Sequence, residues 1–209
     1  MTQITGVFLQ LPTGSLTDQT ISGTAAIDPT KMAQRPLQKF TVAWSSFRVW
    51  DAYASILPST AGTDDLALIT GTWLTDAARI NAGDVKNTTG TRYAIVFVPV
   101  PDNYHDGETV TLRIRAGMAT TVASSSCTID AAAIVRNGSG VASADLVTTA
   151  AQSMNSLTPA DFDFQLNASL LDPGMLLEIR LAIAYTDVAT GTAVTPTIYG
   201  VDLLVDTRG

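Results

Sequence analysis

The chain contains one cysteine and one histidine, and both scarcities exclude classes of site. With Cys127 alone, no disulfide can form within the chain, so the fold needs no oxidising compartment. His105 and Cys127 together are too few for a zinc site of the Cys/His type. A Ser-His-Asp triad would have to use His105, and the chain has no G-x-S-x-G element to supply a nucleophile.

Charged residues are also scarce, at 15% of the 209 residues, and acids outnumber bases to give a net charge of −7. This balance argues against binding to nucleic acid or to anionic membrane surfaces, because phosphates would repel the chain. A neutral surface suits contact with other protein subunits, since interface cores are depleted of charge. No apolar run approaches the ~18 residues of a membrane span, and Met1–Thr5 does not resemble a signal peptide. We therefore expect a soluble protein made in a cytoplasm.

The chain is instead rich in threonine and in runs that alternate apolar with polar residues, which is the period of a half-buried strand. The apolar positions of the clearest runs start at Phe40, Tyr93, Val110, Cys127, Phe162, Leu177 and Tyr199. Residues 51–90 are predicted to be loop-rich, with one short helix at 63–69, and 144–156 are ambiguous between a helical turn and a strand. Seven or eight strands without a long amphipathic helix predict an all-β, antiparallel β-sandwich that is jelly-roll-like.

The domain prediction is an extended N-terminal arm at 1–36 followed by the β-sandwich domain at 37–209. The arm shows little periodicity and is rich in Thr, Gly, Ser and Pro. Its apolar residues can add a strand to a neighbouring molecule, or the segment can be a loosely ordered terminus.

Two groups of acidic residues are closely spaced in the sequence. Asp102, Asp106 and Glu108 crowd the loop around His105 and could hold calcium, although their spacing does not match an EF-hand. Asp161 and Asp163 share one face of a strand, as a glycosidase carboxylate pair would. A solvated loop and a solvent-facing strand explain both groups better. We predict no catalytic, cofactor-binding or metal residues, no cofactor and no enzymatic activity.

The three tryptophans divide by context. Trp44 follows the strand period and is predicted to be core. Trp50 and Trp73 lie near polar loop residues, where an exposed ring would suit a sugar-binding platform.

Several turns and strand starts resemble those of tailed-phage virion structural proteins of the capsid decoration (cement) type. The matching stretches are Leu57-Pro58, Asp64-Asp65-Leu66, Pro101 to Gly107 followed by Val110 to Arg113, Leu171 to Leu176, and Val201 to Gly209. The chain departs from the family at Met175, where the family often has Asp. The resemblance implies a non-enzymatic trimer on the outside of a phage capsid, bound to the major capsid protein and stabilising the head, with no active-site residues.

Two alternatives stay open. One is a carbohydrate- or receptor-binding β-sandwich such as a head fibre, which an exposed Trp50 or Trp73 beside a concave face would favour. The other is a low-copy tail or connector component.

Overall fold

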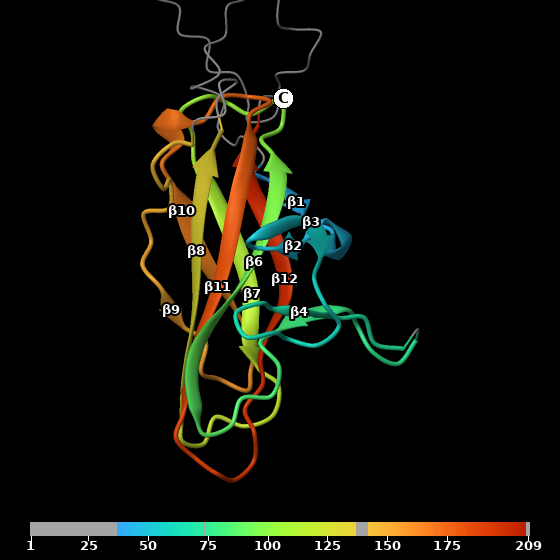
Figure 1. The fold of residues 1–209 in the computed structure, drawn as a ribbon. Helices are drawn as coiled ribbons and strands as arrows, with labels where there is room; N and C mark the ends of the chain where they lie inside the picture. The colour runs from blue at the N-terminus through green and yellow to red at the C-terminus, as the bar shows by residue number, and fades with distance from the viewer. Residues whose placement is uncertain (1–36, 73, 137–141, 208–209) are drawn as a thin grey trace, which may run out of the picture. The chain divides into compact units, whose positions relative to one another are not determined.

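The computed structural model describes residues 37–72, 74–136 and 142–207 (Figure 1). These residues form a sandwich of two antiparallel sheets, which confirms the predicted all-β fold. The predicted arm at 1–36 and Trp73 lie outside the described residues. So does the segment Asn137–Gly140, whose Asn-Gly pair and second glycine are typical of a turn.

Sheet A has the strand order β10-β7-β12-β5-β4, with β1 paired to β12 as well. Its strands are β1 (Leu37–Thr41), β4 (Ala67–Ile69), β5 (Arg79–Asn81), β7 (Val110–Met118), β10 (Ala160–Leu166) and β12 (Pro196–Asp206). Sheet B has the order β3-β2-β6-β11-β8-β9. Its strands are β2 (Arg48–Val49), β3 (Ala52–Ile56), β6 (Thr88–Pro99), β8 (Ser125–Val135), β9 (Gln152–Ser153) and β11 (Leu176–Asp187).

The long strands alternate between the two layers in chain order. β6, β8 and β11 lie in sheet B, whereas β7, β10 and β12 lie in sheet A (Figure 1). Each connection between β6, β7 and β8, and between β10, β11 and β12, therefore crosses from one sheet to the other. This alternation gives the sandwich its jelly-roll-like character.

The core lies between the sheets and is built from the alternating apolar positions that the sequence indicates. Every second residue of β8 from Cys127 to Val135 is buried, and so is every second residue of β11 from Leu177 to Tyr185. Because side chains on a strand alternate between faces, the intervening residues lie on the outer face of sheet B.

β6 is covered on both faces, as its apolar residues at consecutive positions predict. Ala94, Val96 and Val98 pack into the core. On the outer face, Tyr93 and Phe97 are half-buried because aromatic side chains of the β2–β3 hairpin pack against them.

The helix predicted at 63–69 is wrong. Ala67–Ile69 form strand β4, and the Leu66 amide donates to the Tyr93 carbonyl at 2.9 Å. The acids at Asp64 and Asp65 suit a helix start, but long-range pairing with β5 and β6 satisfies this backbone instead.

Trp44 also differs from its prediction. It lies in a 3₁₀ helix, η2 (Trp44–Ser46), rather than in a strand, although its ring packs against the core as expected. In the ambiguous stretch at 144–156, only Gln152–Ser153 form a strand.

The last strand contains an irregularity that the alternation does not predict. The pairing of β12 with β7 shifts between Ile198 and Gly200, which is a β-bulge. Ile198 therefore points into the core with Val201, Leu203 and Val205, whereas Tyr199 is only half-buried.

The two helices bounded in the described part are the short 3₁₀ turns η2 and η3 (Ala168–Leu170). In these residues, no helix has the length and apolar character needed to cross a membrane.

Candidate functional site

A groove of about 450 Å³ lies on the outer face of sheet B, where the β2–β3 hairpin stands beside β6. The hairpin contributes Trp50, Asp51 and Tyr53 to one side. Asp145 lies on the other side, where its carboxylate accepts from the Ala133 amide of β8. Strands β6, β11 and β8 run beneath, so the site is built on the rigid centre of a sheet.

The floor of the groove combines apolar side chains of β6 and β8 with two charged residues of β11. Ile95 of β6 and Ala132 of β8 flank Arg180 of β11, and Ile134 lies opposite Glu178 in the next row. Because residues opposite one another in a sheet project from the same face, these apolar side chains of β6 and β8 flank the two charged side chains of β11.

Tyr53 is the most exposed aromatic residue of the groove, with 44% of its surface accessible. It stands edge-on to Phe97 with ring centroids 5.7 Å apart. Trp50 packs against Tyr93 at 5.1 Å, and its indole Nε1 donates to Asp64 Oδ2 at 3.2 Å. These two aromatic pairs fix the hairpin over the sheet.

Glu178 is the buried charge of the groove and is only 7% exposed. Its carboxylate accepts a hydrogen bond from the Tyr53 hydroxyl at 2.8 Å and forms an ion pair with Arg136 Nε. Burial raises the pKa of Glu178, but the hydrogen bonds from Arg136 and Tyr53 outweigh it, and the pKa lies below its ordinary value. The carboxylate is therefore ionised at neutral pH.

Arg180 supplies an exposed donor beside this carboxylate. Its guanidinium lies 5.3 Å from the centroid of the Tyr93 ring, a cation–π contact that holds it toward β6. The groove thus combines an exposed ring, apolar floor residues, acceptors at Asp51 and Asp145, the buried carboxylate of Glu178, and a donor at Arg180. Such a site suits a ligand with both an apolar face and many hydroxyl groups.

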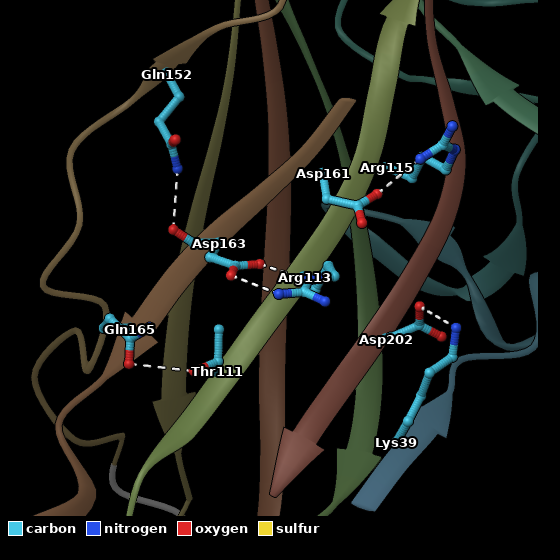
Figure 2. A network of polar contacts seen from close by, with 9 residues as sticks. All are labelled: Lys39, Thr111, Arg113, Arg115, Gln152, Asp161, Asp163, Gln165 and Asp202. Atoms are coloured by element: carbon cyan, nitrogen blue, oxygen red, sulfur yellow. Dashed lines mark hydrogen bonds and ion pairs between the residues drawn. The ribbon is translucent and has the colours of Figure 1, made fainter. Parts of the chain in front are cut away.

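The outer face of sheet A holds Asp161 and Asp163, the two acids predicted to share one face of a strand (Figure 2). Asp163 forms two hydrogen bonds of 2.7 Å with Arg113, and Asp161 pairs with Arg115 at 3.1 Å. The two carboxylates share a face as predicted, and each is held by an arginine of β7. They are therefore a structural ladder across β10 and β7 rather than a free catalytic pair.

The loop around His105 is organised by Tyr104. This tyrosine is fully buried, and its hydroxyl donates to the Glu108 carbonyl at 2.7 Å. His105 Nδ1 lies 3.6 Å from Glu108 Oε1, and Asp102 and Asp106 are exposed. Among the residues that the structure describes, no group of three or more His, Cys, Asp or Glu side chains is arranged to hold a metal ion.

Asp64 and Asp65 are adjacent in the sequence but have different surroundings. Asp64 accepts from Trp50, whereas burial, followed by the charges of Asp64 and Asp51, raises the pKa of Asp65. Cys127 is buried, and burial together with the charge of Asp187 raises the pKa of its thiol to about 11, so it is a poor nucleophile.

The sequence pointed to one groove residue, Trp50, and missed the rest. The alternation that starts at Leu177 places Glu178 and Arg180 on the outer face, where they lie, but Glu178 is buried because Tyr53 covers it. A carboxylate in the middle of an otherwise apolar strand is the local signal that could have marked it.

No protein-family model matches the chain, and no curated protein matches it. Solved structures with some likeness include a xylan-binding CBM22-1 domain from Paenibacillus barcinonensis Xyn10C, with a TM-score of 0.43 and 12% identity over 85% of this chain and 100% of that one. The xylan-binding module CBM15 gives a TM-score of 0.42 and 12% identity, over 83% of this chain and 100% of that one. A family 30 carbohydrate-binding module of a Clostridium thermocellum cellulase gives a TM-score of 0.42 and 11% identity, over 82% of this chain and 100% of that one. Likenesses at this level assign neither a family nor a ligand to the chain.

Proposed function

We propose that this protein is a carbohydrate-binding β-sandwich and that the groove beside the β2–β3 hairpin is its glycan site. The observation that carries the proposal is the exposed Tyr53 ring standing over apolar floor residues beside Glu178 and Arg180. The apolar face of a sugar ring packs on an aromatic side chain, and its hydroxyls bind carboxylate and guanidinium groups.

Trp50 lines the groove, but it is not the exposed ring that a sugar-binding platform needs. Its ring is half-buried against Tyr93, so it shapes the wall of the groove. Tyr53 is the ring left free to stack on a ligand.

The test is a glycan array followed by calorimetry on the best ligand with Tyr53→Ala. We expect the substitution to weaken binding about tenfold or more, because it removes the stacking surface. Tyr53→Phe keeps the ring and should retain most of the affinity. Leu170→Ala is the matched control, since Leu170 is comparably exposed but does not line the groove.

Full binding by Tyr53→Ala would place the glycan elsewhere. An array without any ligand for the intact protein would refute the proposal.

A second proposal concerns where the protein works. We propose that it sits on the outside of a tailed-phage head as a decoration protein, as a trimer on the major capsid protein. In addition to the low charge content, large apolar residues are exposed at dispersed points of the sandwich, among them Ile56, Leu74 and Val188. Dispersed exposed apolar residues are common on monomers. They favour the proposal only together with the small share of charged residues in the chain.

Copy number in purified particles, measured by quantitative mass spectrometry, tests this placement. A ratio of order one to the major capsid protein is the expected result. A few copies per particle would indicate a fibre, tail or connector component, and absence from particles would refute a virion role.

A further inference from the structure

The outer face of sheet B has a second hollow, of about 220 Å³, farther along the same strands. It lies over the row Thr91–Ala184–Thr128 and the row Thr89–Thr186–Ser126, which cross β6, β11 and β8. Both hollows are thus centred on β11.

Hydroxyl groups dominate the second hollow, and no charged side chain lines it. Thr89 donates to Thr186 at 3.2 Å. Within the described part of the chain, the structure records no hydrogen bond to the hydroxyls of Thr91, Thr128 or Ser126. These groups are available to an uncharged ligand rich in hydroxyls.

Between the hollows, the row on the outer face is Tyr93–Ala182–Asp130, so the β11 residue there has a short side chain. Ala184 follows Ala182 in the second hollow. The Arg180 guanidinium lies over the Tyr93 ring, on the β6 side of this row. The span from Glu178 to Thr186 is eight residues of extended strand, or roughly 26 Å, which is long enough for several sugar rings in line.

We infer that the ligand is an uncharged, unbranched β-1,4-linked glycan chain that lies parallel to β11 and occupies both hollows. This inference rests on the proposed glycan site and adds the direction, length and chemistry of its ligand. An unbranched β-1,4-linked chain is extended, so it can follow one strand through both hollows. An anionic polysaccharide would meet the three carboxylates of the first groove. A charged chain of either sign would find no counter-charge in the second hollow.

The experiment is calorimetry of the intact protein with cello-, xylo- and manno-oligosaccharides from the disaccharide to the hexasaccharide. For at least one series, affinity should rise by about tenfold or more between the trisaccharide and the hexasaccharide. Ala184→Leu fills the second hollow and should reduce hexasaccharide affinity to that of the trisaccharide. It should leave trisaccharide binding unchanged.

Two further variants keep the result interpretable. Thr91→Val with Thr128→Val removes hydroxyls at nearly constant volume and should weaken only the longer ligands. Ala160→Leu, at an exposed position of β10 in the other sheet, is the control for added bulk.

Equal affinity for short and long ligands would overturn the inference while leaving the glycan site intact. A length dependence that survives Ala184→Leu would overturn the path along β11. If none of the three series binds, the proposed ligand is wrong, whereas the glycan site itself fails only if the array shows no Tyr53-dependent ligand.

Discussion

Glu178 links the stability of the sandwich to its site. Its carboxylate is taken out of water between β6 and β8, yet it receives hydrogen bonds from both Tyr53 and Arg136. A buried carboxylate with such partners orients them, so Glu178 positions the ring that we assign to sugar stacking.

We therefore predict that Glu178→Gln lowers the free energy of unfolding at pH 7 by about 1–3 kcal/mol. Because the folded-state pKa of Glu178 is lowered, the stabilisation is complete above the ordinary carboxyl pKa of about 4.3 and is lost as the pH falls through the lowered value. Urea unfolding of both proteins between pH 3 and pH 7 should show their difference shrinking in acid.

Asp161→Asn is the control, because its exposed ion pair with Arg115 should contribute less than about 1 kcal/mol. A difference between wild type and Glu178→Gln that is independent of pH would contradict the prediction.

The sequence indicates residue orientation well but not residue proximity. The alternation in 177–185 puts Glu178 and Arg180 on the outer face, which is where they lie. It carries no information that Tyr53, more than a hundred residues earlier, closes over Glu178. That contact depends on the β2–β3 hairpin packing against β6, which is a long-range event.

At the scale of elements, length separates what could be predicted from what could not. β7, β8, β10 and β11 are long enough for alternation to mark them. β4, β5 and β9 have two or three residues, and they are strands because distant partners pair with them. The predicted helix at 63–69 fails for this reason: local propensity favours one structure and the sheet supplies another.

The end of β7 gives a test of how tightly the elements pack. A Cβ atom on Gly117 would lie 3.0 Å from the Ser156 carbonyl oxygen and 3.1 Å from Pro159 Cα, both of them backbone atoms. We predict that Gly117→Ala lowers the free energy of unfolding by about 1–3 kcal/mol, because the segment at 156–159 must move. Urea denaturation measures the change.

Gly191→Ala is the matched control, since nothing lies within 4 Å of its added methyl. It should change stability by no more than about 0.5 kcal/mol. Equal effects of the two substitutions would show that the close approach at Gly117 is not limiting.

For the whole molecule, residues 35–209 form one compact unit by themselves. The described core runs continuously from Val42 to Val205 and draws on both sheets. We predict that a chain starting at Arg35 still unfolds in one cooperative thermal transition. Under the proposed functions, it should still bind the glycan but no longer attach to the capsid. Calorimetric unfolding and a particle-binding assay check the three outcomes. A broad, non-cooperative transition would show that residues 1–34 are needed for folding, and full attachment would refute a role for the arm.

The position of β12 has a consequence for how the protein is made. This strand follows its partners β7, β5 and β1 in the chain, so the centre of sheet A is made after the strands on either side of it. Until residues 196–206 leave the ribosome, β7 lacks one of its two neighbours in the sheet. The sandwich therefore closes only after residues 196–206 emerge. Its folding should be slow and dominated by contacts between distant parts of the chain, such as that of Leu37 with Asp206.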